Sequence, residues 1–201
     1  MRYSPEHKRQ TRERILAAAA STLKRDGLAG ASVEKIMAEA GLTVGGFYAH
    51  FRSKDELLGE ALAGSVAGSA APWLQGLESS EGLAFVQGLV RRYLNRAHRD
   101  QPEIGCALAP ALSELARASE ETRRGAATGV EALVHSLVAR LPGSSEAKRR
   151  EAAIGVLALC AGGIGLSRAL AGTGLSDEVL RACRSFAEAA LRSEPESSRA
   201  D

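Results

Sequence analysis

Alanine fills 37 of the 201 positions of this chain, and Leu, Glu and Arg are also common. These residue types have high helix propensity. Aromatic residues make up 4% of the chain, and Val, Ile and Thr are sparse, which argues against a large β-sheet. Apolar residues recur at helical spacing between breaks of Gly, Pro and Ser. The sequence therefore predicts an all-α fold.

The breaks divide the chain into nine predicted helices. Gly27 is placed where a helix C-cap needs positive φ. Ser32, Thr43, Ser53 and Ser176 are predicted N-caps, because their hydroxyl oxygens accept from free backbone N–H groups. The expected helices cover residues 6–26, 33–40, 44–50, 54–72, 80–98, 105–118, 120–140, 145–171 and 176–192.

The second and third predicted helices are short, and a tight turn containing Gly41 joins them. Two such helices form a helix-turn-helix arrangement, and the first helix completes a three-helix head. The sequence predicts a helix-turn-helix domain at residues 1–52, a second helical domain at 53–193 and a disordered polar tail at 194–201.

The formal net charge of +2 conceals an asymmetry along the chain. Residues 1–54 hold ten Lys/Arg against five Asp/Glu, a charge of +5, and residues 55–201 hold sixteen against nineteen, a charge of −3. A basic segment at one end of a chain indicates contact with a polyanion. Lys8, Arg9, Arg12 and Arg14 crowd the first helix, either as DNA contacts or as a solvated helix face.

Several classes of protein are disfavoured. The apolar run at residues 152–166 is about fifteen residues, shorter than a bilayer span. The polar N-terminus has no apolar signal-peptide core, so we expect a cytoplasmic protein without a membrane partner. Three widely spaced Cys argue against disulfides or a zinc site. No catalytic Ser/His/Asp set or phosphate loop is present, so we expect no enzyme activity, no metal and no cofactor.

The most informative stretch is AGLTVGGFYAHFRSKDEL, at residues 40–57. Small side chains at residues 43–46 allow close approach to a DNA groove. Phe47 and Phe51, four positions apart, share one helix face and are expected to face inward. Tyr48 and His50 then project outward, where their polar tips reach phosphate oxygens.

Lys54 lies at the start of the next predicted helix, where backbone N–H groups and an ammonium group together bind a phosphate. Ser53 and Glu56 form a capping box at the same helix end.

These residues resemble the TetR/AcrR family of bacterial transcriptional repressors. The resemblance covers residues 8–60, about a quarter of the chain. It rests on the first-helix run Thr-Arg-Glu-Arg-Ile-Leu-Ala-Ala-Ala, on Gly27, Ser32, Ile36 and Ala40, on Gly41-Leu42-Thr43, Gly45, Phe47-Tyr48 and His50-Phe51, and on Ser53-Lys54 with Leu57.

The resemblance implies a homodimer that reads a palindromic double-stranded DNA operator and binds a small-molecule inducer in its second domain, which also dimerises. It also implies the DNA contacts. Base-facing positions would be Thr43, Val44, Gly45 and Gly46, and phosphate positions Ser32, Tyr48, His50 and Lys54. Arg9 and Arg12 join them from the basic cluster.

Val44 and Gly46 depart from the family pattern, since many relatives carry Arg, Gln, Thr or Ser there. Neither side chain makes a hydrogen bond to a base. Direct readout would then rest on Thr43, on contact of Val44 with a thymine methyl group and on DNA shape.

Two further residue sets follow from the resemblance. The helices around the family's ligand cavity carry residues that are either ligand contacts for a neutral or weakly polar molecule or plain core: Trp73, Phe85, Tyr93, Cys106, Leu112, Val130 and His135. The last two helices are unusually apolar and form either a dimer interface or an intramolecular hairpin; the expected interface residues are Ile154, Leu157, Ala158, Ala161, Val179, Cys183 and Phe186.

Cys106 opens a predicted helix, where the helix dipole lowers a thiol pKa. It is therefore either a sensor of oxidants or electrophiles, or a pocket-lining or buried thiol. Taken together, the sequence predicts a ligand-responsive repressor. The alternative is a helical interaction or ligand-binding protein without a DNA role.

Overall fold

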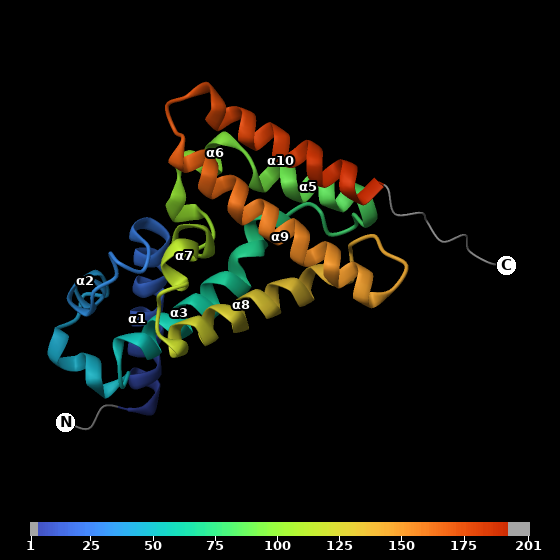
Figure 1. Cartoon of the computed structure of the whole chain (residues 1–201). Helices are drawn as coiled ribbons and strands as arrows, with labels where there is room; N and C mark the ends of the chain where they lie inside the picture. The colour runs from blue at the N-terminus through green and yellow to red at the C-terminus, as the bar shows by residue number, and fades with distance from the viewer. Residues whose placement is uncertain (1–3, 193–201) are drawn as a thin grey trace. The chain divides into compact units, whose positions relative to one another are not determined.

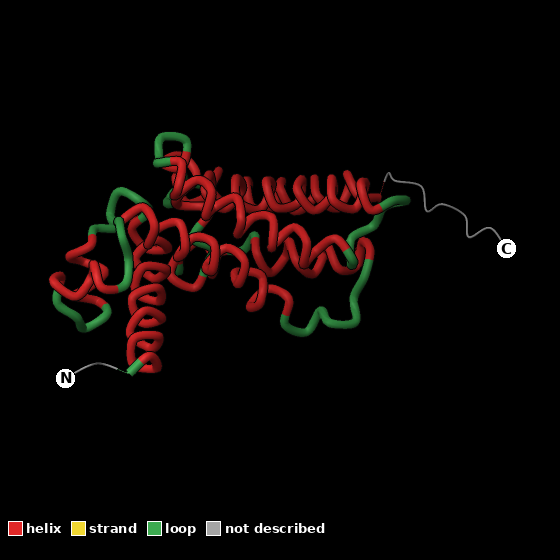
Figure 2. The backbone as a smooth tube through the Cα atoms, turned by 90° about the horizontal axis from the view of Figure 1, so that it is seen from below, coloured by secondary structure: helices red, strands yellow, loops and turns green. Residues whose placement is uncertain are grey.

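A computed structural model of the chain describes residues 4–192, and these residues form helices and loops with no strand among them (Figures 1 and 2). The predicted all-α fold is confirmed, and each of the nine predicted helices has a counterpart. The predicted tail lies outside the described residues. The α-helices are α1 (Pro5–Asp26), α2 (Val33–Glu39), α3 (Lys54–Ala67), α4 (Ala71–Leu74), α5 (Gly82–Tyr93), α6 (Arg96–Asp100), α7 (Leu108–Leu115), α8 (Glu120–Val138), α9 (Glu146–Ala169) and α10 (Gly174–Arg192), and the 3₁₀ helices are η1 (Val44–Ala49), η2 (Gly68–Ala70) and η3 (Pro102–Ile104).

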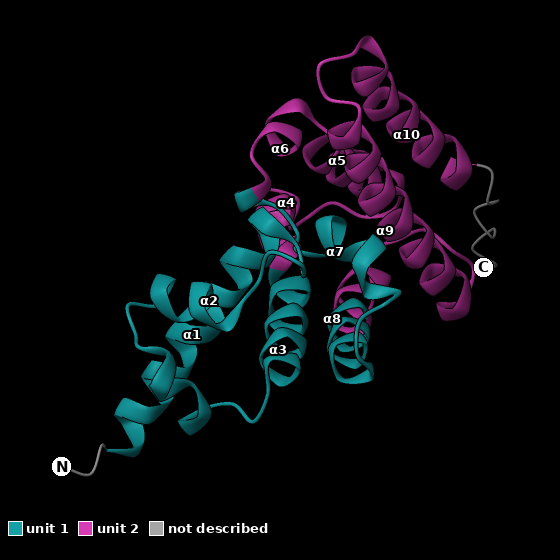
Figure 3. Ribbon diagram, turned by 60° about the vertical axis from the view of Figure 1, so that its left-hand side comes forward, with its two compact units in different colours: residues 1–68, 103–130 teal, residues 69–102, 131–201 magenta. Residues whose placement is uncertain are grey.

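The described chain forms two compact units (Figure 3). Unit 1 contains residues 4–68 and 103–130, and unit 2 contains residues 69–102 and 131–192. This division does not follow the predicted boundary at residues 52 and 53. The reason is that α3 and α7 pack on α1 and therefore belong with the head.

The third helix of the head is a 3₁₀ helix, whereas the sequence predicted an α-helix. It is only six residues long and contains Gly45 and Gly46, which have low α-helix propensity. Thr43 precedes it but makes no side-chain cap hydrogen bond, so the predicted cap is wrong. The caps at Ser32 and Ser53 are confirmed, because each hydroxyl accepts from the backbone N–H three residues later.

Two helix boundaries in unit 2 also differ from the prediction. The expected helix at residues 80–98 is interrupted between α5 and α6, because Asn95 caps α6 by accepting from the backbone N–H of His98 at 2.8 Å. The last helix begins at Gly174, so Ser176 lies inside its first turn. The Ser176 hydroxyl donates instead to the backbone oxygen of Ser167 on α9 at 2.7 Å.

Unit 1 has a core of apolar residues from α1, α2, η1, α3, α7 and α8. The predicted C-cap of α1 is confirmed, since Gly27 has a φ of 68° and its N–H donates to Leu23. The Glu114 carboxylate of α7 then accepts from the backbone N–H groups of Leu28 at 2.5 Å and Ala29 at 3.1 Å. This carboxylate therefore holds the turn between α1 and α2.

The first part of α8 lies against α3 almost backbone to backbone. A Cβ atom added at Gly125 would lie 2.1 Å from the carbonyl oxygen of Gly59, and one at Gly129 would lie 2.8 Å from that of Ala63. Real Cβ atoms do not approach so closely. The contact of α3 with α8 therefore requires glycine on α8.

In unit 2, α9 packs against α10, α5 and α6, and α5 also packs against α10 and α4. By length and composition alone, α9 would reach across a membrane, with a mean hydropathy of 1.6 over its most apolar stretch. This is weak evidence for a membrane span, because the core helix of a bundle passes the same test. The apolar run noted in the sequence covers only residues 152–166, whereas the helix that contains this run, α9, is 24 residues long.

We expect Gly125→Ala to lower the stability of the chain by about 2 kcal/mol, because the added methyl group forces α3 and α8 apart. Gly64→Ala is the matched control on α3, where an added Cβ meets nothing within 4 Å. It should leave stability unchanged or raise it, since Ala is the better helix former. Urea unfolding followed by circular dichroism checks both variants. Equal midpoints would contradict the close contact.

Glu114→Ala should loosen the turn between α1 and α2, because two backbone N–H groups lose a charged acceptor. We expect faster amide hydrogen exchange at Leu28 and Ala29 and a stability loss of about 1.5 kcal/mol. Glu120→Ala is the control, since that exposed carboxylate pairs with Arg124 on its own helix. Unchanged exchange at Leu28 and Ala29 in Glu114→Ala would refute the role of Glu114.

Candidate nucleic-acid interface

Helix α2, the turn after it and η1 form the predicted helix-turn-helix. Ser32 caps α2 by accepting from the N–H of Lys35 at 3.2 Å. Gly41 continues the turn with a φ of 67°, and the N–H of Leu42 donates to the carbonyl oxygen of Met37 at 2.8 Å. The left-handed backbone at Gly41 favours glycine, and it sets the direction in which η1 leaves α2.

Phe47 and Phe51 anchor η1, as predicted. Both rings are buried, and they stack on each other with centroids 5.8 Å apart. The Arg12 guanidinium of α1 lies 4.5 Å above the Phe51 ring and pairs with Glu60 of α3 at 2.5 Å. Arg12 therefore joins α1, η1 and α3 around the buried rings.

The opposite face of η1 is open to solvent. The Tyr48 side chain is 75% exposed and Val44 is 41% exposed, and Thr43 and Gly45 are exposed as well. Tyr48 keeps one edge on the buried ring of Phe47, with centroids 5.1 Å apart in a T-shaped arrangement. A fixed and exposed phenol group on this face is free to meet an external partner.

Lys54 is exposed and is the first residue of α3. The predicted capping box is formed at this helix end, but the Glu56 carboxylate binds a different backbone N–H from the one expected. Ser53 Oγ accepts from the N–H of Glu56 at 2.9 Å, and the Glu56 carboxylate accepts from the N–H of Arg52 rather than of Ser53. The end of α3 that carries Lys54 is therefore well ordered.

A groove of about 770 Å³ lies between the first half of α1 and η1. His50 is half-buried in it, and among residues 4–192 its Nδ1 atom has no hydrogen-bond partner. Burial lowers the pKa of His50, and the positive charges of Lys8, Arg12 and His7 add to this effect. The groove is lined by Pro5, His7, Lys8, Thr11, Arg14, Met37, Leu42, Thr43, Gly46, Ala49 and His50.

The arginines of the basic cluster have different local partners. Arg9 is exposed and pairs with Glu6 and Glu13 of its own helix, both at 2.8 Å, so a phosphate could replace these weak partners. Arg12 is engaged inside the head, as described above. Arg14 donates to the carbonyl oxygen of Ala40 at 2.7 Å and so supports the turn before η1.

The predicted ligand residues are divided between the two units. Trp73 and Tyr93 line one cavity of about 30 Å³ in unit 2, and Phe85 is buried beneath the Arg140 guanidinium. The other four members do not line this cavity. His135 and Leu112 are exposed, Val130 is half-buried, and Cys106 is buried.

The predicted dimer residues differ in exposure. Ile154 is 47% exposed and Phe186 is 68% exposed, and Ala158 is also exposed. Leu157, Val179 and Cys183 are half-buried. Ala161 is only 3% exposed, so its side chain already packs within its own chain. A groove of about 450 Å³ beside Phe186 is lined by residues of both α9 and α10.

Cys106 lies just before α7, and its Sγ accepts from the N–H of Leu108 at 3.4 Å. Its 2% exposure fits the interpretation as a buried thiol. Within residues 4–192 no group of three or more His, Cys, Asp or Glu is arranged to hold a metal ion.

Two residues with a clear structural role were missing from the predicted sites. Glu114 holds the turn at Leu28 from more than eighty positions away, and nothing in the local sequence connects them. His98 lies in unit 2 against the rings of Trp73 and Tyr93, with both centroid distances 4.4 Å. Its sequence neighbours at residues 95–101 are mostly polar or charged, so no local signal indicates that His98 is buried.

Comparisons with known proteins agree with this geometry. A search of curated proteins found no match. A TetR-family regulator from Cytophaga hutchinsonii is similar over 95% of this chain and 98% of its own, with 20% identity and a TM-score of 0.69. A TetR regulator from Chloroflexus aurantiacus is similar over 92% and 96%, with 20% identity and a TM-score of 0.69. Reduced Escherichia coli NemR is similar over 88% and 95%, with 22% identity and a TM-score of 0.67.

These structures share the fold of the whole chain. The profile of the bacterial regulatory proteins of the tetR family matches residues 15–61, which run from α1 through the helix-turn-helix into α3. The chain therefore carries a helix-turn-helix head that matches the tetR family model, and over its length it has the fold of solved TetR-family regulators.

Proposed function

We propose that this chain is a repressor that binds a palindromic operator as a homodimer and is released when a small molecule binds its second domain. The DNA contacts are those of the exposed face of η1 and the start of α3: Thr43, Val44, Gly45, Gly46, Tyr48, His50 and Lys54, with Ser32 and Arg9 beside them. Arg12 acts from inside the head by holding η1 in place.

The observation that carries this proposal is the pair of glycines in η1, of which Gly45 is exposed and Gly46 is half-buried at the edge of the groove. A Cβ at Gly45 meets nothing within 4 Å, and one at Gly46 meets only Met37 at 4.0 Å. Neither glycine has positive φ. Within the chain nothing requires glycine here, although glycine costs about 1 kcal/mol in a helix. Close approach of an external surface, such as a DNA groove, accounts for both.

The charge of the head supports the same partner. Lys8 lines the groove beside η1, and Lys54 is exposed at the start of α3. The exposed hydroxyl of Tyr48 adds a neutral donor. Cationic groups and neutral donors around a short reading helix are the usual set of phosphate contacts.

Dimerisation is supported by the apolar surface of unit 2. Ile154, Leu166, Leu175 and Phe186 are large apolar residues on α9 and α10, and each is about half exposed or more. Burying such a face against a second copy removes it from water. The two heads of a dimer then read two half-sites of one operator.

A ligand releases the dimer from DNA only if it binds more tightly to a conformation of the dimer in which the two heads do not fit the operator. The coupling is reciprocal, so operator DNA must weaken ligand binding by the same factor.

Lys54→Ala tests the proposal on the chain's own upstream intergenic DNA. We expect about a tenfold loss of affinity per head, the value of one charge-assisted hydrogen bond. The slope of log K against log salt should become less negative by about 0.9 per head. Fluorescence anisotropy with labelled duplex at several salt concentrations measures both.

Lys148→Ala is the matched control, since it removes the same charge from α9 in unit 2. It should leave the salt slope unchanged. Equal slopes for wild type and Lys54→Ala would reject the phosphate contact. A folded dimer that binds no DNA at low salt would reject the regulator and favour an interaction protein without a DNA role.

Binding should also depend on pH through His50. Burial and the nearby cations lower its pKa in the free chain, and a phosphate beside it would raise that pKa. DNA binding would then take up a proton, so affinity should increase as the pH falls below neutrality. The gain is up to about tenfold for each pKa unit between the free and bound states. Anisotropy titrations of wild type and His50→Gln measure this, and an identical pH dependence would exclude His50.

A further inference from the structure

An exposed, branched apolar side chain stands at the start of η1. Val44 is the first residue of this helix and is 41% exposed. Its neighbours Thr43 and Gly45 are exposed too, and a Cβ atom at Gly45 would meet nothing within 4 Å. The space beside Val44 is therefore open, and its apolar side chain is accessible from outside the chain.

Val44 is also held in a defined position. Its side chain branches at Cβ, which restricts its rotamers. The helix itself is fixed by the buried rings of Phe47 and Phe51. A stiff apolar group on a fixed backbone loses little conformational freedom when a partner covers it.

The other residues at the start of η1 give little discrimination between bases. Gly45 and Gly46 have no side chain. The Thr43 hydroxyl makes no cap hydrogen bond, so it can turn toward a base edge. A hydroxyl group both donates and accepts, however, and therefore fits either kind of base edge. Val44 is then the residue of this group that can distinguish one base from another.

The major groove of DNA offers one apolar group to such a side chain. This is the C5-methyl group of thymine. Cytosine carries a hydrogen atom on the same carbon, and 5-methylcytosine carries the methyl group in the same place. An apolar contact at this point therefore separates thymine and 5-methylcytosine from cytosine, but it does not separate thymine from 5-methylcytosine.

We propose that Val44 reads the C5-methyl group of a thymine in each half-site, and that it accepts 5-methylcytosine but not cytosine in place of that thymine. Methylation of a cytosine at this position then raises the affinity of the chain for DNA. This inference rests on the proposed function, and it adds the covalent state of the DNA as an input beside the small molecule.

Other bases fit Val44 less well. Adenine and guanine present polar atoms in the major groove, and Val44 would displace water from these atoms without replacing its hydrogen bonds. Cytosine leaves the valine facing a gap where the methyl group would lie. Loss of one buried methyl group costs about fourfold in affinity per half-site, and about fifteenfold for a dimer on two half-sites.

Uracil replaces thymine without changing the base pairing, because the two bases differ only in the C5-methyl group. The chain's own upstream intergenic DNA is therefore amplified once with thymidine triphosphate and once with deoxyuridine triphosphate. We expect the full chain to bind the thymine duplex about fifteenfold more tightly than the uracil duplex in fluorescence anisotropy. Equal affinities overturn the proposal.

Variants of Val44 test whether this residue causes the difference. Val44→Ser removes both methyl groups at similar helix propensity, and the ratio of the two affinities should fall close to one. Val44→Ile keeps a branched apolar side chain and should keep the wild-type ratio. A wild-type ratio in Val44→Ser overturns the proposal, since the difference would then come from DNA shape.

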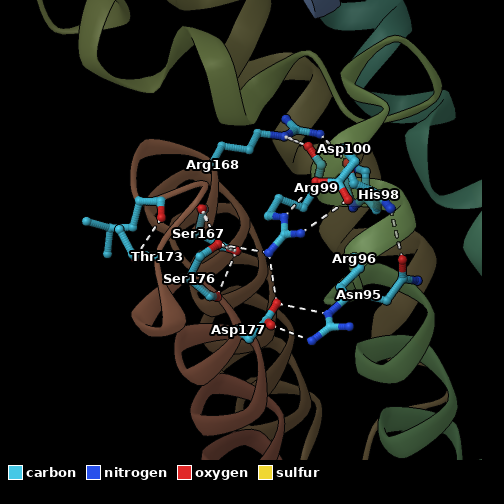
Figure 4. A network of polar contacts seen from close by, with 11 residues as sticks. Asn95, Arg96, His98, Arg99, Asp100, Ser167, Arg168, Thr173, Ser176 and Asp177 are labelled. Atoms are coloured by element: carbon cyan, nitrogen blue, oxygen red, sulfur yellow. Dashed lines mark hydrogen bonds and ion pairs between the residues drawn. The ribbon is translucent and has the colours of Figure 1, made fainter.

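The matched control removes a methyl group from another exposed branched side chain. Thr173 is exposed in the turn between α9 and α10 (Figure 4), and its hydroxyl donates to the carbonyl oxygen of Leu170 at 2.8 Å. Thr173→Ser removes the methyl group and keeps this donor, so it should leave the ratio of thymine to uracil affinity unchanged. A ratio that falls as far in Thr173→Ser as in Val44→Ser overturns the assignment to Val44.

Methylated cytosine is tested at the base that Val44 contacts. Single replacements of thymine by uracil within the protected region of the operator locate that base. A C·G pair there in both half-sites should lower the affinity, and a 5-methylcytosine·G pair should raise it again about fifteenfold for wild type but not for Val44→Ser. Equal affinity of wild type for the cytosine and 5-methylcytosine duplexes overturns the proposal.

Failure of this inference and failure of the proposed function give different results. Circular dichroism and size-exclusion chromatography check that each variant folds and assembles as wild type does. If Val44→Ser does not, the comparison of cytosine with 5-methylcytosine on the wild-type chain still decides. Equal binding of the thymine and uracil duplexes overturns the methyl contact alone and leaves the DNA-binding regulator in place. A folded dimer that binds neither duplex at low salt overturns both.

Discussion

The burial of Phe47 and Phe51 is the interaction on which the head depends. Six residues that include two glycines have too little helix propensity to hold a shape by themselves. The two stacked rings secure η1 from beneath, and Arg12 covers them while it reaches Glu60. Because the inner face of η1 is fixed in this way, its outer face can carry small and polar residues that do not contribute to the core.

Much of this arrangement could be predicted from the sequence, because it is local. Caps at Ser32 and Ser53, the left-handed Gly27 and the inward pair Phe47 and Phe51 each follow from residues within four positions of one another. The type of η1 was missed, because helical spacing over six residues does not distinguish a 3₁₀ helix from an α-helix.

The contacts that could not be predicted connect distant parts of the sequence. Glu114 meets the turn at Leu28, and Gly125 meets Gly59, across gaps that no periodic pattern bridges. These contacts place α7 and the first part of α8 in the same compact unit as the head. In unit 2, likewise, the ring of His98 finds Trp73 only after the chain breaks between α5 and α6 at Asn95.

The open space at Gly45 has a consequence for how this chain can change. A larger residue there would meet no atom of its own protein and would raise local helix propensity. The position is therefore decoupled from folding, and a single codon change could introduce a polar side chain at no cost in stability. Under the proposed function, a larger residue at Gly45 would alter only the contact with DNA, while the rings beneath, at Phe47 and Phe51, stay unchanged.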